Sequence, residues 1–154
     1  MEDTKKLIQE AEQAFITADH LCTITLPFLK ETKLMIPIIQ GLETAINKSI
    51  EALLTFEHTH TSMKELPATP EEQLSLFQHT IMPAYKIPKD LLKTIKNVKT
   101  IIKQHQQSTV EFARKENYFL CDKNYKMKIL NSQELKNFLF TTRPLINLVR
   151  GLPC

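Results

Sequence analysis

Residues 35–56 read MIPIIQGLETAINKSIEALLTF, and this stretch decides the fold class. Its apolar side chains recur every three or four residues, which is the period of an α-helix with one buried face. The buried stripe consists of Met35, Ile38, Ile39, Leu42, Ala45, Ile46, Ser49, Leu53 and Phe56. Pro37 falls in the first turn, where proline is tolerated. We therefore expect a long helix over about residues 34–58.

The same spacing predicts helices on both sides of this stretch. They cover about residues 4–28, 70–82 and 88–105, with a last helix that begins at Asn131 or Ser132. Thr69 and Asn131 are suitable N-cap residues. Pro27 should kink or end the first helix, and Pro144 should split the last one. Because the link between the first two helices is short, we expect them to form an antiparallel pair at the centre of a bundle.

The pattern differs between residues 108 and 130. Ser108-x-x-Glu111 fits a capping box that opens a short helical turn over residues 112–115. Residues 118–121 and 125–129 read as two strands of a hairpin, with Asn124 in the connecting loop as the residue that tolerates positive φ. In the second strand Tyr125, Met127 and Ile129 share one face, and we expect this apolar face to dock on the helices.

These elements predict a mainly α fold, an antiparallel bundle of four to five helices with one small β-hairpin near residues 118–129, in a single domain over residues 1–154. The 154-residue length suits one core. The acidic start, Met1-Glu2-Asp3, does not resemble a signal peptide. The three cysteines are odd in number and far apart, which is typical of reduced thiols. A cytoplasmic protein without a membrane span is the expectation.

Charge is distributed unevenly along the chain. Residues 1–83 carry six lysines and no arginine against twelve acidic residues, a net charge of −6. Residues 84–154 carry fourteen lysines and arginines against five acidic residues, a net charge of +9. Such a division indicates a polyanionic partner or surface for the basic half.

The basic half contains the candidate nucleic-acid-binding residues. They are Lys93, Lys96, Lys99, Lys103, Arg114, Lys115, Lys123, Lys126 and Lys128. The aromatic residues interleaved with them are Phe112, Tyr118, Phe119 and Tyr125, and exposed rings can stack on bases. Only three of the twenty basic residues are arginine, which favours recognition of an RNA or ribonucleoprotein backbone over base reading. The alternatives are a solvated surface, or an acidic protein partner, including the acidic half of a second copy.

The C-terminal segment, residues 143–154, is apolar with two arginines. Its candidate partner-binding residues are Arg143, Leu145, Leu148 and Val149. They support a second hypothesis, that the protein is a protein–protein adaptor or an antitoxin-like module. Packing of this segment on the bundle is the alternative.

No catalytic residue, metal site or cofactor is predicted, so an enzyme is not the expectation. Glu57-x-x-His60 has the spacing of one half of a di-iron site, but a second such motif is missing. His20 and Cys22, two apart on a helix, would diverge, and no Cys-x-x-Cys occurs. Cys22 is therefore expected in the core. Cys121 lies beside the acidic Asp122, a poor setting for a nucleophilic thiolate.

Two resemblances bear on function. Size and helical content are similar to those of the HEPN group of small RNA-cleaving and RNA-binding bundles, but no histidine follows any arginine at the four-to-six-residue spacing of their catalytic pair. Residues 108–115, STVEFARK, with YFLCD (118–122) and YKMK (125–128), resemble a family of uncharacterised small archaeal helical proteins. PFLK (27–30) and IQGLE (39–43) are similar to it in layout. The second resemblance implies no site, but it marks Glu111, Phe112, Arg114 and Lys115 as a unit to test.

Overall fold

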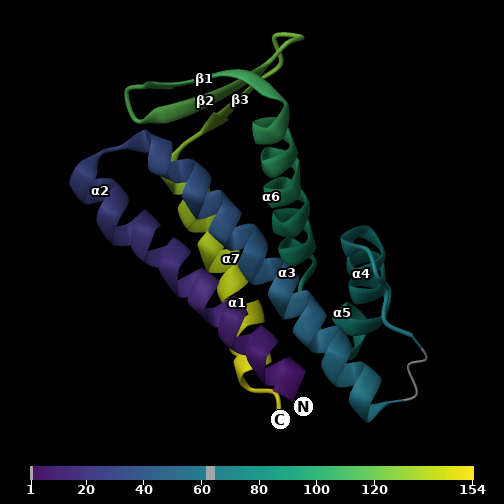
Figure 1. Ribbon diagram of the computed structural model, residues 1–154. Helices are drawn as coiled ribbons and strands as arrows, with labels where there is room; N and C mark the ends of the chain where they lie inside the picture. The colour runs from purple at the N-terminus through teal and green to yellow at the C-terminus, as the bar shows by residue number, and fades with distance from the viewer. Residues whose placement is uncertain (1, 62–64) are drawn as a thin grey trace.

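Long helices run side by side along the molecule and a small sheet lies across one end (Figure 1). The computed structural model describes residues 2–61 and 65–154. The long helices are α1 (Glu2–His20), α3 (Met35–His60), α6 (Lys89–Gln107) and α7 (Ser132–Arg150). Helix α3 packs against the other three, so the apolar stripe that opened the sequence forms the centre of the core. The mainly α prediction is confirmed.

Helices α1 and α3 form the expected antiparallel pair. Their axes come close at Gly41, where an added Cβ would lie 3.2 Å from the Cβ of Ala18. Cys22 is fully buried next to this contact region, as predicted. Burial raises the pKa of the Cys22 thiol, and the nearby charge of Lys136 offsets part of that rise.

Pro27 does not end the first helical segment. A π-helical turn, η1 (Leu21–Thr25), follows α1 and leads into α2 (Leu26–Leu29). The amide of Leu26 donates to the carbonyl of Leu21, five residues back. The wider turn accommodates a proline ring that would otherwise clash with the preceding turn. A 3₁₀ turn, η2 (Thr32–Leu34), then leads into α3.

The segment after the gap repeats this arrangement. Helix α4 (Pro70–Leu76) continues through the π-helical turn η3 (Phe77–Ile81) into α5 (Met82–Ala84), and Pro83 follows the π turn as Pro27 does. The Thr69 hydroxyl accepts a 3.2 Å hydrogen bond from the amide of Glu72, so the predicted N-cap is confirmed.

Pro144 does not split α7, which runs unbroken over Ser132–Arg150. Because Pro144 has no N–H, the carbonyl of Phe140 has no helical donor. Phe140 and Pro144 are both exposed, so this carbonyl lies on the solvent side of the helix. The start of the helix is as predicted. The side chain of Asn131 accepts a 2.8 Å hydrogen bond from the amide of Glu134.

The sheet has three antiparallel strands rather than the two of a hairpin. In order across the sheet they are β1 (Ser108–Arg114), β2 (Asn117–Asp122) and β3 (Met127–Leu130). The predicted capping box and helical turn over residues 108–115 are wrong, because this segment pairs with β2. Ser108 instead closes α6, since its hydroxyl donates to the carbonyl of Gln104 at 2.8 Å. Positive φ falls at Tyr125 and Lys115 rather than Asn124.

The predicted orientation of the last strand is also wrong. Tyr125, Met127 and Ile129 are 89%, 51% and 44% exposed, and they point away from the helices. The residue that faces the core is Leu130, which pairs with Tyr118 of β2 and is fully buried. Lys128, on the same side as Leu130, is accommodated there because its amine pairs with the carboxylate of Glu134 at 2.9 Å.

Candidate functional site on the two faces of the sheet

The side of the sheet that faces away from the helices is apolar and uncovered. We call it the outer face, and it consists of Val110, Phe112, Phe119, Met127 and Ile129. The register places Phe112, Phe119 and Ile129 in one row across the strands. A row of large, partly exposed apolar side chains is unusual on a monomeric protein and is typical of contact surfaces.

Two of these side chains form a flat aromatic step. The rings of Phe112 and Phe119 are stacked, with centroids 4.8 Å apart and an angle of 3° between their planes. Phe112 is 39% exposed, so part of this step is open to solvent. Tyr125, at the tip of the β2–β3 connection, adds a third exposed ring.

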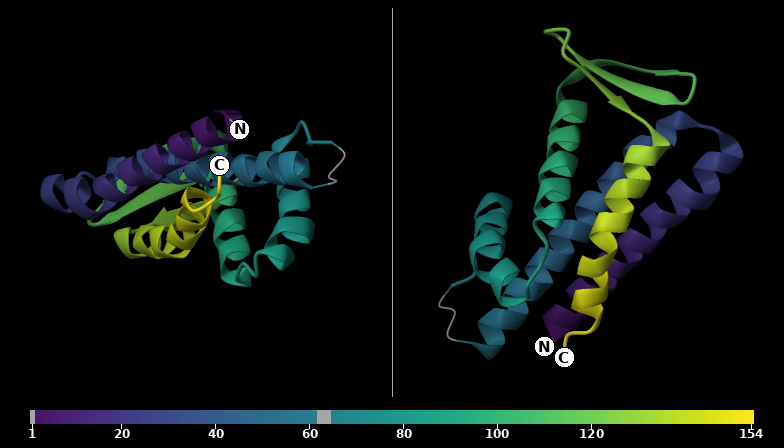
Figure 2. Two further views of the ribbon diagram at one scale, coloured as in Figure 1. Left: turned by 90° about the horizontal axis from the view of Figure 1, so that it is seen from below. Right: turned by 180° about the vertical axis from the view of Figure 1, so that it is seen from behind.

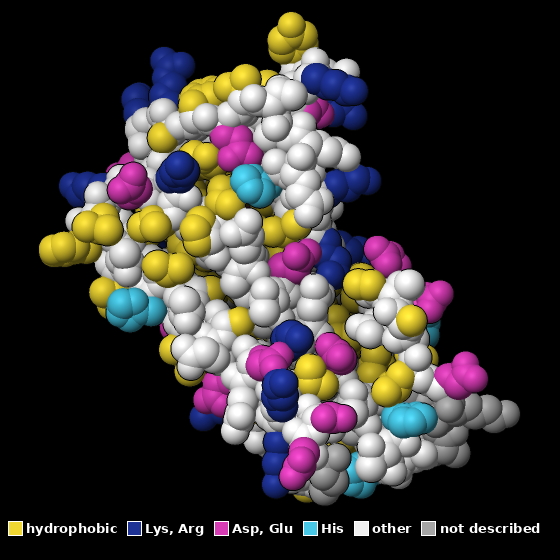
Figure 3. All heavy atoms as spheres, in the orientation of Figure 1, with side chains coloured by type: hydrophobic (Ala, Val, Ile, Leu, Met, Phe, Trp, Pro, Cys, Tyr) yellow, Lys and Arg dark blue, Asp and Glu magenta, His cyan; other side chains and the backbone are white. Residues whose placement is uncertain are grey.

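Basic side chains border the outer face. We call Arg114, Lys115, Lys123 and Lys126 the basic rim, and all four are exposed. None of them forms an ion pair within residues 2–61 and 65–154. Figure 3 shows Lys and Arg side chains at both ends of the sheet, with hydrophobic side chains between them. This end of the molecule therefore combines basic side chains that form no ion pair in the described chain with an apolar, partly aromatic surface.

The other predicted basic residues divide into two groups. Lys93, Lys96 and Lys103 are exposed along α6, which leads directly into β1. Lys99 instead donates to the side-chain oxygen of Asn47 on α3 at 2.7 Å. Lys99 and Lys128 thus serve contacts within the protein, whereas the remaining seven candidates extend into solvent.

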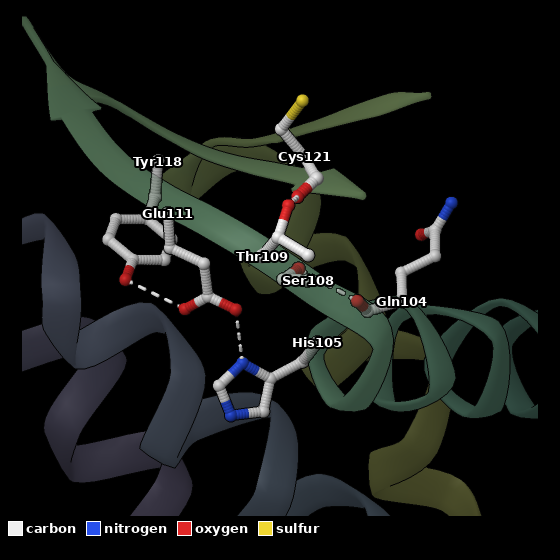
Figure 4. Close-up of polar contacts among 7 residues, drawn as sticks. All are labelled: Gln104, His105, Ser108, Thr109, Glu111, Tyr118 and Cys121. Carbon is white, nitrogen blue, oxygen red and sulfur yellow. Dashed lines mark hydrogen bonds and ion pairs between the residues drawn. The ribbon is translucent and has the colours of Figure 1, made fainter. Parts of the chain in front are cut away.

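The opposite side of the sheet, the inner face, carries a carboxylate-centred cluster. Glu111 of β1 accepts from the Tyr118 hydroxyl at 2.9 Å and contacts Nδ1 of His105, at the end of α6, at 2.6 Å. Figure 4 shows both partners converging on the one carboxylate, with the second ring nitrogen of His105 pointing away from it. The cluster ties the end of α6 to the first two strands.

This cluster lies at a pocket of about 470 Å³ between β1 and the start of α3. The remaining lining residues are Glu31, Lys33, Leu34, Ile36, Pro37 and Gln40. Nδ1 contacts Glu111, and Nε2 of His105 has no hydrogen-bond partner among the described residues. Burial, followed by the hydrogen bond to Glu111, raises the pKa of Tyr118 to about 12, so this hydroxyl stays protonated at neutral pH.

The C-terminal candidates lie largely inside the bundle. Leu145 and Val149 are 2% and 0% exposed, and Leu148 is partly buried against the core. Arg143 is exposed, and it pairs with Asp19 at 3.2 Å and lies over the ring of Phe15. This arrangement agrees with packing of the segment on the bundle.

The remaining motif residues have structural partners. The carboxylate of Glu57 accepts a hydrogen bond from Tyr85, and His60 is stacked on Phe56. Within the described ranges, no three His, Cys, Asp or Glu side chains come together as a metal site. No helix of the described chain is long and apolar enough to cross a membrane.

The fold and this site define a class in structural terms, a mainly helical protein with a small antiparallel sheet that exposes an apolar face at one end. Comparisons with protein-family models, curated proteins and solved structures found no match to the chain. The resemblance to small archaeal proteins therefore stays a prediction. Sequence reasoning missed His105, because its carboxylate partner, Glu111, lies on strand β1, a segment for which the sequence predicts a capping box and a helical turn.

Proposed function

We propose that this protein binds single-stranded RNA, alone or in a ribonucleoprotein, on the outer face of its sheet. The observation that supports the proposal most strongly is the partly exposed Phe112–Phe119 step beside the basic rim. Aromatic rings stack on bases of any sequence, and lysines attract the phosphates that connect those bases. The outer face offers both contacts on one surface.

The arrangement favours a single strand over a duplex. A stacking contact needs an unpaired base with an open face, which a duplex does not present. The basic rim is mostly lysine, and lysine binds phosphate as a point charge without a fixed bidentate geometry. Binding should therefore depend strongly on salt and only weakly on sequence.

Fluorescence anisotropy with a labelled single-stranded RNA tests the proposal. The wild-type chain should bind with log K falling by roughly 0.7 per phosphate contact for each unit of log salt. The double variant Phe112→Ala/Phe119→Ala should weaken binding about tenfold or more, since stacking on each base contributes about 1–3 kcal/mol. Circular dichroism on each variant reports whether the fold is intact.

A matched pair of charge reversals locates the surface. Arg114→Glu/Lys126→Glu changes the basic rim and should abolish binding. Lys5→Glu/Lys6→Glu makes the same charge change on exposed residues of α1, whose start lies at the end of the molecule away from the sheet (Figure 1). An equal loss of RNA affinity in the two variants would show that binding depends only on the net charge of the protein. Unchanged RNA affinity in the rim variant would contradict the proposal.

A second candidate function is a protein–protein adaptor, and one observation favours it. Phe140 of α7 is 79% exposed at the edge of an apolar pocket of about 330 Å³, which Pro144, Leu145 and Leu148 help to line. Affinity purification with and without nuclease separates the two functions. Partners that persist after nuclease treatment and are lost in Phe140→Glu would support the adaptor, whereas loss on nuclease treatment alone would support RNA.

A further inference from the structure

Another pocket lies beneath the end of the sheet where β1 turns into β2. Its volume is about 370 Å³, and the α2–η2 connection, the β1–β2 turn and the first two turns of α7 line it. The rear view in Figure 2 shows these three segments meeting, although they are far apart in the sequence. The side chains that matter for its chemistry are Lys30, Thr32, Lys115, Glu116, Ser132 and Lys136.

The lining has an excess of two positive charges. Lys30, Lys115 and Lys136 come from the three different segments, and Glu116 supplies the one opposing charge. None of the three lysines forms an ion pair within the described chain. Like charges repel, so three amines gathered at one pocket with a single opposing carboxylate are most favourable when an anion binds among them.

Neutral hydrogen-bond donors accompany this charge. Thr32 is 8% exposed and lines the pocket, and its hydroxyl has no hydrogen-bond partner in the described chain. Ser132 lines the pocket as the first residue of α7, a helix of 19 residues. Asn131 caps the amide of Glu134, and the amide of Ser132 has no acceptor among the described residues. The Thr32 hydroxyl is therefore available to donate to a bound ligand, and a helix start favours an anion.

We propose that this pocket binds a terminal phosphate monoester of RNA, an inference that rests on the proposed function. A monoester carries a charge of about −1.5 to −2 at pH 7 and three acceptor oxygens, whereas each phosphodiester inside a strand carries one charge. The dianion therefore matches the two excess positive charges and the hydroxyl donors. Arg114 of the basic rim directly precedes Lys115, which lines the pocket. An RNA strand that binds the outer face and terminates at this turn therefore places its terminal phosphate at the pocket.

Binding of one RNA oligomer in three forms tests the inference: with a 5′-phosphate, with a 3′-phosphate and with hydroxyls at both ends. At least one phosphorylated form should bind about tenfold more tightly than the hydroxyl form. The variant Lys30→Ala/Lys136→Ala should lose this preference and keep the affinity for the hydroxyl form, because neither lysine belongs to the basic rim. The control Lys5→Ala/Lys6→Ala should keep the preference.

The outcomes separate the two proposals. Equal affinity for all three forms, or an unchanged preference in Lys30→Ala/Lys136→Ala, would overturn the pocket and leave RNA binding intact. Absence of any RNA binding would overturn the proposed function, and adenosine monophosphate then serves as the probe of the pocket. A rise in Tm with the monophosphate but not with adenosine, lost in the double variant, would support phosphate binding. No rise would overturn it.

Discussion

The two faces of the sheet use alternate residues of the same strands, yet they have opposite relations to the rest of the molecule. On the inner face Leu120 and Leu130 are buried and Glu111 holds two partners. On the outer face Phe112 and Ile129 remain 39% and 44% exposed. The comparison shows that the inner face attaches the sheet to the helices, whereas the outer face adds little to the fold and is free for a partner.

The largest expected difference concerns apolar truncation on each face. Leu120→Ala removes a side chain that is 1% exposed and should lower the free energy of unfolding by about 2–5 kcal/mol. Ile129→Ala, on the neighbouring strand of the outer face, should lower it by less than about 1 kcal/mol. Urea unfolding of the two variants measures both values. Similar losses would show that the outer face is covered in solution.

A smaller effect is expected from the carboxylate of the inner face. Glu111→Ala leaves the Tyr118 hydroxyl and Nδ1 of His105 without their acceptor, which should cost about 1–3 kcal/mol of unfolding free energy. Glu116→Ala, in the exposed β1–β2 turn, is the matched control and should change stability by less than about 0.5 kcal/mol. Thermal unfolding of both variants tests the prediction, which fails if they are equally stable.

The inner face should also be sensitive to high pH. The pKa of Tyr118 is raised from 10.0 to about 12 in the folded chain, so the unfolded chain releases this proton first as pH rises. The stabilisation from this residue is complete below pH 10 and is lost between pH 10 and about 12. Urea unfolding over this range should show a shallower decline for Tyr118→Phe than for the wild type. Parallel curves would argue against the contribution of Tyr118.

The pKa of Tyr85 is likewise raised to about 12, by burial and by its hydrogen bond to Glu57, so it loses its stabilising effect in the same pH range. The double variant Tyr85→Phe/Tyr118→Phe should therefore have the shallowest decline of all. Tyr85 lies outside the sheet. Comparing the single variants Tyr85→Phe and Tyr118→Phe therefore shows how much of the loss of stability at high pH comes from the inner face.

The smallest effect separates two lysines of the same region. Lys128→Ala removes the partner of the partly buried Glu134 and should cost about 1 kcal/mol. Lys126→Ala changes an exposed residue of the basic rim and should alter stability by less than about 0.5 kcal/mol while weakening RNA binding. Chemical denaturation should show the larger loss of stability for Lys128→Ala. An RNA-binding assay should show the larger loss of affinity for Lys126→Ala.

The sequence was most informative where periodicity was long. The helices over α1, α3, α6 and α7 could be predicted because each repeats its apolar stripe over several turns. Strand β1 could not, because Ser108-x-x-Glu111 matches a capping box and the apolar alternation of Val110 and Phe112 leads to an exposed face. For β3, the assumption that Met127 and Ile129 must be buried gave the wrong face, since Glu134 compensates Lys128.

Part of the candidate site consists of residues that the sequence singles out for their charge and aromatic rings. Seven of the nine basic candidates are exposed, and their role in binding stays a prediction. Which rings share a face was not predictable without the register of β1. The pocket of Lys30, Lys115 and Lys136 could not be found by spacing at all, because three distant segments supply its lysines.

Both termini lie together at the end of the molecule opposite the sheet (Figures 1 and 2). A tether to a sensor chip or a fluorescent fusion at either terminus would therefore leave the sheet directed outward and unobstructed. The same proximity allows the ends to be joined by a short linker and the chain to be reopened in the β2–β3 connection. Such a circular permutant would keep the helices intact while dividing the outer face at a chosen point.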